Sequence, residues 1–383
     1  MCILCDTPPD DIDNESLMIS CVNIDTIPYL PHVHTLFIEE CDNLLNIPRL
    51  RNLRKLDIID CEMFHRLPSC NRLMELFISN TSIQFLPSMG SLEILDIRHC
   101  QQFKTIAGTM PNLTTMIVIQ CDQFVLPPPE KVPLLFELEM KRSYIETIPN
   151  YPLLNFLSID SMYLLSEIPQ FDNLESLIIM DCMLIAKIPA IPLLYRLSIY
   201  GTHGFLEIPG RPSDLPNLTI LHISNYWVRH IPAYPRLQKV RCRNCPYLQD
   251  VSGMNLILLE INNCPQVSAM PTTIDELEYF ECDERSPLRV YMNFFISNPG
   301  RTTEEKRRYD QNMNKLHYLQ HKFRDYLSKR RIRKFLSLCF SESFCVKFWN
   351  PDEMGGRWCI NRLYRFCNQL SEMRGQIHGQ IDN

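Results

Sequence analysis

Cysteine is the residue type in this chain with the most chemistry to offer. The 383 residues include 17 cysteines and 10 histidines. Thiolates can act as nucleophiles, redox couples or zinc ligands. Cys2 and Cys5 form a CxxC pair, but no second pair follows at the spacing of a zinc site. This pair therefore does not predict a bound metal.

The pattern of reactive residues does not predict catalysis either. The last cysteines of the chain lie mostly among apolar neighbours, and the nearby histidines are not at metal-site spacing from them; these residues are Cys339, Cys345, Cys359, Cys367, His317, His321 and His378. The chain contains no glycine-rich phosphate loop, HExxH or GxSxG motif. We expect neither an enzyme nor a cofactor.

Seven other cysteines occupy one position of a repeated pattern: Cys41, Cys61, Cys100, Cys121, Cys182, Cys245 and Cys264. Stacked strands lie about 4.8 Å apart, whereas the Cβ atoms of a disulfide prefer about 3.8 Å. A buried thiol at such a position can donate a weak hydrogen bond to a main-chain carbonyl. We expect free thiols, which are typical of a reducing compartment.

The repeated pattern is clearest in residues 173–194, NLESLIIMDCMLIAKIPAIPLL. Leu174, Leu177 and Ile179 follow one another at spacings of three and two, Cys182 comes next, and the series begins again at Leu194. The Leu-x-Ile core predicts a short strand with alternating inward and outward side chains. One copy cannot bury its own apolar face, so each copy needs neighbours.

The first apolar residue of each copy recurs at steps of 19 to 24 residues, at Val33, Leu53, Leu73, Leu92, Leu113, Leu135, Leu154, Leu174, Leu194, Leu218, Leu237, Leu256 and Leu277. This pattern resembles the short, 20-residue class of the leucine-rich-repeat family. The proline-containing far side (IPNYP, IPAIP, IPAYP) is similar to the short bacterial effector type. The resemblance covers roughly residues 14–284.

The resemblance implies an α/β fold with two domains. We expect residues 1–284 to form an array of about 13 to 14 repeats, a right-handed solenoid with a parallel inner sheet and a mostly extended convex side. The sequence predicts that residues 285–383 form a basic helical region. Thr302 and Glu305 form a capping box, and the apolar spacing that follows predicts a helix to about Leu338 that caps the last repeat. A further helix is expected over 360–370.

Charge divides between these two regions. Residues 1–284 carry 19 basic and 35 acidic side chains, a balance of −16, and residues 285–383 carry 19 and 9, a balance of +10. The run Lys329–Lys334 predicts an adaptor whose basic region engages a second, acidic partner or nucleic acid. The alternative is a solvated helix face or one that meets the acidic array. No nucleic-acid motif accompanies the charge, so nucleic acid is the less favoured partner.

Three narrower resemblances concern partners and location. Residues 319–332 resemble the IQ motif, which implies a calmodulin-like partner. The whole arrangement is loosely similar to leucine-rich-repeat proteins of giant DNA viruses, which implies the cytoplasm of an infected host cell. Short-repeat bacterial effectors often carry a ubiquitin-ligase domain, but no recognisable catalytic arrangement surrounds the cysteines after Arg285.

The start of the chain and its apolar runs bear on location. The segment MCILCDTPPDD turns acidic within six residues, and no run reaches the ~20 apolar residues of a membrane span. We expect a cytoplasmic protein without membrane contact.

The residues expected to point away from the core form the candidate site. On the concave face they include Phe37, Asp57, Phe77, Asp96, Ile117, Glu139, Phe156, Ile178, Met180 and Tyr200. Aromatic and branched side chains beside carboxylates are typical of interaction sites, although neighbouring side chains could cover several of them. The sequence therefore predicts a non-catalytic scaffold that binds a basic protein partner. The insertions 125–133 and 210–216 are either further recognition features or tolerated loops.

Overall fold

The computed structural model describes residues 15–201, 208–251, 253–267, 277–283 and the single residues 271, 286 and 288. The chain divides into two compact units. The first is Met1–Trp227 with Pro232–Leu237, and the second is Val228–Ile231 with Gln238–Asn383. The CxxC pair, the helices expected over 302–338 and 360–370, the basic run and the IQ-like stretch all lie outside the described residues.

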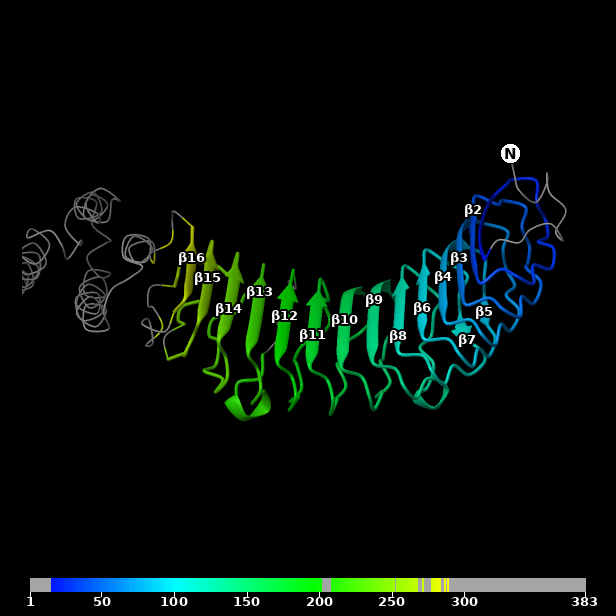
Figure 1. Ribbon diagram of the computed structural model, residues 1–383. Coiled ribbons are helices and arrows are strands. Elements are labelled where there is room, and N and C mark those ends of the chain that lie inside the picture. The colour runs from blue at the N-terminus through cyan, green and yellow to red at the C-terminus, as the bar shows by residue number, and fades with distance from the viewer. Residues whose placement is uncertain are drawn as a thin grey trace, which may run out of the picture. The chain divides into compact units, whose positions relative to one another are not determined.

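The first unit is a stack of short parallel strands, one from each repeat (Figure 1). Its main sheet contains, in spatial order, β1 (Ser16–Ser20), β2 (Thr35–Glu39), β3 (Lys55–Cys61), β4 (Glu75–Thr81), β6 (Ile94–Arg98), β8 (Thr115–Ile119), β9 (Glu137–Ser143), β10 (Phe156–Met162), β11 (Ser176–Met180), β12 (Arg196–Tyr200) and β13 (Ile220–Ser224). A separate pair, β5 (Phe85–Leu86) and β7 (Thr105–Ile106), is also parallel.

The second unit contains strands of the same kind. β14 (Lys239–Arg243), β15 (Leu258–Asn262) and β16 (Tyr279–Cys282) pair in parallel, in that order. In both units equivalent residues of successive repeats lie side by side, as Leu157 does with Leu177 and Ile159 with Ile179. The register of the sheets therefore follows the register of the sequence repeat.

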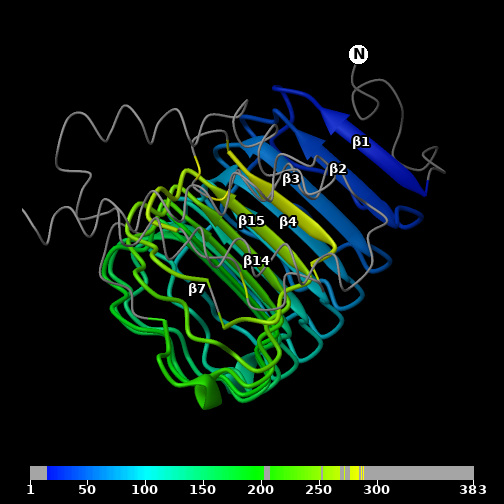
Figure 2. The same cartoon turned by 90° about the vertical axis from the view of Figure 1, so that its left-hand side faces the viewer.

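The core of each unit lies between the sheet and the segments that return the chain to the next strand (Figure 2). In the repeat around β11, Leu177 and Ile179 point inward from the strand, and Ile185 and Ile188 close the interior from the other side, all at most 4% exposed. The alternation of buried and outward residues along the strands is the one that the Leu-x-Ile spacing predicted.

The chain leaves most strands through a residue in the left-handed conformation. Positive φ angles of 48° to 55° occur at Glu40, Asp60, Asn80, His99, Gln120, Arg142, Ser161, Asp181, Asn225, Asn244 and Asn263. Several of these residues donate their backbone N–H to the carbonyl at the end of the next strand, as Asp181 does to Tyr200 at 2.9 Å. This turn directs the following residue, usually cysteine, into the core.

The seven cysteines of the repeat are buried free thiols, as expected. Each Sγ donates to the carbonyl two residues earlier, at 3.2 to 3.5 Å. Some also reach the strand of the preceding repeat, as Cys264 does to the carbonyl of Cys242 at 3.6 Å. The expected thiol-to-carbonyl hydrogen bond is confirmed.

The expected α/β class needs correction, because the described residues contain no α-helix. They contain two 3-10 turns, η2 (Pro129–Lys131) and η3 (Pro212–Asp214), one in each insertion. Proline removes a backbone donor and fixes φ, and a repeat of about 20 residues leaves little chain for a helix after the strand and its turns. The described part is thus a β-solenoid. None of its helical turns is long and apolar enough to cross a membrane.

Candidate functional site

The ten residues predicted for the site all lie on the outward face of the first unit's sheet. They occupy the first, third or fifth positions of strands β2 to β12, and each is half-buried. Eight inter-strand steps at ~4.8 Å give these residues a track about 38 Å long. The predicted orientation is confirmed, whereas their role in binding remains a prediction.

Four of the seven apolar or aromatic members lie on the adjacent strands β10, β11 and β12. Met180 lies opposite Tyr200, and both are at the fifth strand position. Phe156 is at the first position of β10, and Ile178 is at the third position of the adjacent β11. Because diagonal neighbours on adjacent strands remain within reach of long side chains, these four residues form one apolar cluster. We call Phe156, Ile178, Met180 and Tyr200 the apolar cluster below.

Phe77 is more covered than its sequence position suggests. The guanidinium carbon of Arg98 lies 5.4 Å from the centroid of the Phe77 ring. This is a cation–π contact between β4 and β6. The pairing of the two strands brings Arg98 there, and the sequence pattern alone did not indicate it. Phe77 is therefore a weaker candidate for an anchor than the apolar cluster.

Two of the predicted carboxylates are already paired on their own strands. Asp96 binds Arg98 at 2.8 Å, and Glu139 binds Lys141 at 2.9 Å. Residues two apart on a strand share a face, so the spacing could have revealed both pairs. Such partly exposed ion pairs add little to stability, but they reduce the attraction that Asp96 and Glu139 exert on a basic partner.

Asp57 is different, because it forms no ion pair among the described residues. Lys55, two positions earlier, is bound to Glu75 at 2.8 Å. Burial raises the pKa of Asp57, the charge of Lys55 opposes that rise, and Glu75 and Asp96 add to it. Asp57 is thus the carboxylate of the predicted set that is available to a cationic group.

Near the apolar cluster, three serines at outward strand positions are buried, which the sequence reasoning did not predict. Ser158, Ser176 and Ser198 are buried although they occupy outward strand positions, and Ser198 is 0% exposed. The Oγ of Ser198 and the Nε of Arg196 are buried and lack a hydrogen-bond partner. The sequence could have indicated these buried serines, because they are small polar residues at strand positions where other repeats carry large side chains.

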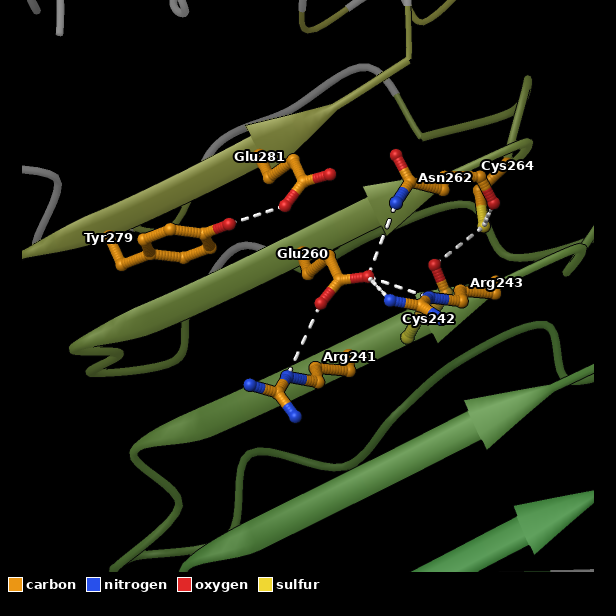
Figure 3. Close-up of polar contacts among 8 residues, drawn as sticks. All are labelled: Arg241, Cys242, Arg243, Glu260, Asn262, Cys264, Tyr279 and Glu281. Carbon is orange, nitrogen blue, oxygen red and sulfur yellow. Dashed lines mark hydrogen bonds and ion pairs between the residues drawn. The ribbon is translucent and has the colours of Figure 1, made fainter.

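The second unit carries a buried carboxylate on its outward face (Figure 3). Glu260 on β15 is 3% exposed. Its Oε2 accepts from Arg241 Nε at 3.2 Å, and its Oε1 accepts from Arg243 Nε at 2.6 Å and from Asn262 Nδ2 at 3.2 Å. Losing one partner of a buried charge is costly. We interpret this cluster as a cross-link between β14 and β15.

Metal binding finds no support in the described residues. They contain no group of three or more His, Cys, Asp or Glu side chains arranged to hold a metal ion. On the outward faces the side chains offer apolar contacts and charge, which are suited to recognition of another surface.

One short parallel strand per repeat, leucine and isoleucine in the interior and a repeat of about 20 residues define a leucine-rich-repeat solenoid. No protein-family model matches the sequence. The comparison with curated proteins finds no significant match.

The solved structures that are similar to this chain include the following three. A leucine-rich-repeat protein of Leptospira interrogans is 16% identical with a TM-score of 0.43, and the match covers 76% of this chain and 95% of that one. The plant peptide hormone receptor RGFR1 in complex with RGF2 is 14% identical with a TM-score of 0.32, over 70% and 55%. YopM from Yersinia enterocolitica is 15% identical with a TM-score of 0.29, over 71% and 90%.

Proposed function

We propose that this protein is a non-catalytic scaffold that binds a protein partner on the outward face of the first unit's sheet. The observation that carries the proposal is the apolar cluster on β10, β11 and β12. Parallel sheets are usually covered on both faces. Here the described residues cover only the inner face, which supports a partner as the second cover.

The dimensions of this face suit a protein surface. A track of about 38 Å accommodates a helix or a small domain, and standard interfaces bury about 800 Å² on each partner. Apolar anchors at the centre of an interface can each contribute about 2 kcal/mol or more. The apolar cluster would supply the anchors, the partly exposed ion pair of Glu139 lies on the adjacent strand β9, and that of Asp96 lies two strands further away on β6.

The expected preference for a basic partner applies only to the part of the outward face around β3. Asp57 on β3 lacks an ion pair within the described part of the chain, whereas Asp96 and Glu139 are paired. We therefore propose that a cationic group of the partner lies over β3. The apolar anchors are further along the sheet, so charge would orient the partner more than hold it.

Site-specific photo-crosslinking tests the proposal. A photoreactive amino acid replaces Ile178 in the full-length protein, and the control replaces Val125, which is 65% exposed in an insertion. After the crosslinked partner is identified and purified, its Kd is measured for the Ile178→Glu/Met180→Glu double variant and for Val125→Glu. We expect at least a tenfold loss for the double variant and none for the control. A folded double variant with unchanged Kd would contradict the proposal.

A second candidate is the adaptor, favoured by the +10 balance of residues 285–383. This region would engage an acidic partner while the sheet binds another protein. Truncation after residue 288 should then remove one partner and keep the other, and loss of both would contradict the adaptor. The buried free thiols support a cytoplasmic location for either candidate.

A further inference from the structure

We infer that Arg196 and Ser198 form a recognition site for an acidic side chain of the protein partner. The two residues are at the first and third positions of β12 and therefore share the outward face, about 7 Å apart along the strand. This inference rests on the proposed function, because it assigns a ligand chemistry to part of the same surface.

The first argument is that Arg196 lacks the carboxylate partner that the other outward cations of the first unit have. Four lysine or arginine side chains occupy outward strand positions in the first unit: Lys55, Arg98, Lys141 and Arg196. The first three each bind a carboxylate at 2.8 to 2.9 Å. The Arg196 side chain makes no ion pair or hydrogen bond with the described residues, and its Nε is buried.

The second argument is the charge of the surrounding strands. The outward positions of β11, β12 and β13 are Ser176, Ile178, Met180, Arg196, Ser198, Tyr200, Ile220, His222 and Ser224, and none is a carboxylate. Glu175 and Asp181 lie beyond the two ends of β11, and Asp160 on β10 accepts a hydrogen bond from Ser161 at 2.9 Å. Within the described part of the chain, no outward position of these three strands therefore offers a carboxylate to Arg196.

The third argument is Ser198. Its side chain is completely buried on the outward face, and its Oγ has no hydrogen-bond partner. Leaving a buried polar group unsatisfied typically costs about 1–3 kcal/mol. The two groups belong to residues two apart on one strand face, and a carboxylate that displaced the side chains covering them could accept a hydrogen bond from each, because its oxygens accept several hydrogen bonds.

The neighbours of this pair specify the context of the ligand. Ser198 lies between Ile178 on β11 and His222 on β13 in the sheet register. Tyr200 follows on the same strand, and Ile220 lies opposite Arg196. An aspartate or glutamate flanked by apolar residues would place its carboxylate on Arg196 and Ser198 and its neighbours on the apolar cluster. The same partner would then present a cation to Asp57 and an anion to Arg196.

A peptide titration followed by NMR tests the site directly. The full-length protein carries ¹⁵N-labelled arginine, and the Nε–H signal of Arg196 is assigned by its absence in Arg196→Lys. The probes are acetyl-Leu-Glu-Leu-amide, its glutamine analogue and its phosphoserine analogue. We expect the glutamate peptide to shift the Arg196 signal saturably, with binding at least tenfold tighter than that of the glutamine peptide.

Variants separate recognition from structure. Ser198→Ala should weaken binding of the glutamate peptide several-fold and leave the thermal unfolding midpoint unchanged or higher, because it removes an unsatisfied buried hydroxyl. Arg196→Gln should abolish binding of the glutamate peptide. Because this variant has no Arg196 signal, its titration is followed on the signals of ¹⁵N-labelled tyrosine instead. Arg98→Gln is the matched control, since Arg98 already binds Asp96, and it should bind the peptide as the unmodified protein does.

Several outcomes would overturn the inference. These are an unshifted Arg196 signal, equal binding of the glutamine peptide, or a Ser198→Ala variant that loses stability and keeps its affinity. Tenfold tighter binding of the phosphoserine peptide would overturn the choice of a carboxylate in favour of phosphate. The titration uses no protein partner, so its failure leaves the crosslinking test of the proposed function intact. A negative crosslinking result would likewise leave the titration interpretable.

Discussion

At the scale of single residues, burial controls the chemistry of this chain. Of the eleven cysteines in the described part of the chain, ten are buried free thiols and Cys21 is half-buried. Burial raises the pKa of Cys121 to about 12 and that of Cys182 to about 11. Cys41 differs, because a hydrogen bond with the thiol of Cys61 lowers its pKa to about 7, while Cys41 itself remains 0% exposed.

These thiols should resist alkylation in the folded protein. We expect iodoacetamide at pH 8 to leave Cys121 and Cys182 unmodified, because they are inaccessible and protonated, and to modify both after unfolding in urea. Mass spectrometry of the digested protein quantifies each site. Disulfides between Cys41 and Cys61, or between Cys245 and Cys264, in the unreduced protein would contradict the assignment of free thiols.

Asp57 predicts a defined dependence of stability on pH. Burial raises its pKa above the ordinary 3.8. Protonated Asp57 therefore contributes stability to the folded protein. This contribution is fully present below the ordinary pKa of 3.8 and is lost as pH rises through the raised pKa of the folded protein. We expect Asp57→Asn to have a higher unfolding midpoint than the unmodified protein at pH 7, and the difference to shrink as pH falls through 4.

The control for this comparison is Asp172→Asn, because Asp172 is exposed and forms no hydrogen bond or ion pair with the described residues. Its unfolding midpoint should follow that of the unmodified protein at every pH. A midpoint for Asp57→Asn that is lower at pH 7 would show that attraction to Lys55 outweighs the cost of burial.

At the scale of the elements, neighbouring repeats approach so closely that some positions admit no side chain. A Cβ on Gly108 would lie 2.1 Å from the backbone nitrogen of Ser88 and 2.4 Å from its Cα. The two segments are also hydrogen-bonded, since Met89 N–H donates to the carbonyl of Thr109 at 3.1 Å. The close contact therefore belongs to the stacking of repeats and not to one loop.

Gly108→Ala should thus separate two hydrogen-bonded segments. We expect a loss of about 1–3 kcal/mol in the free energy of unfolding, the usual range for overpacking, measured by urea denaturation. Gly90→Ala is the control, because a Cβ there meets nothing within 4 Å. Equal stability of the two variants would show that the backbone adjusts freely at Gly108.

At the scale of the whole molecule, stability arises from contacts between successive repeats. Each strand of the sheet pairs with its neighbours in register, and the interior continues from one repeat to the next. In such arrays the free energy of folding is approximately a sum over repeats and their interfaces. The array should therefore tolerate the deletion of a whole repeat but not the deletion of part of one.

Deletion of residues 174–193, one repeat, should preserve the fold, because Leu194 then takes the place of Leu174. We expect a cooperative thermal transition at a lower temperature, since one repeat and one interface are lost. Deletion of residues 174–183 should instead place polar residues in the core and abolish cooperative unfolding. Circular dichroism melting curves compare the two, and equal behaviour would contradict a repeat-based stability.

The sequence by itself determined the solenoid, because a repeated Leu-x-Ile spacing has one solution in which every copy buries its apolar face. It also determined which side of each strand faces outward, including Ile178 and Met180, since that follows from alternation alone. It did not reveal the left-handed residue after the strands, because asparagine, glutamate, histidine and arginine all occupy that place.

Only the tertiary structure decided how the outward side chains interact. Whether Phe77 is free or covered depends on Arg98 of the next strand, and whether Glu260 is exposed or buried depends on Arg241 and Arg243 of the preceding one. Arg196 became a candidate because the adjacent strands carry no carboxylate at outward positions. The periodicity of the sequence determines whether a side chain points inward or outward. Its neighbours across the sheet are residues about 20 positions away in the sequence. How these side chains pack is decided only when the strands stack.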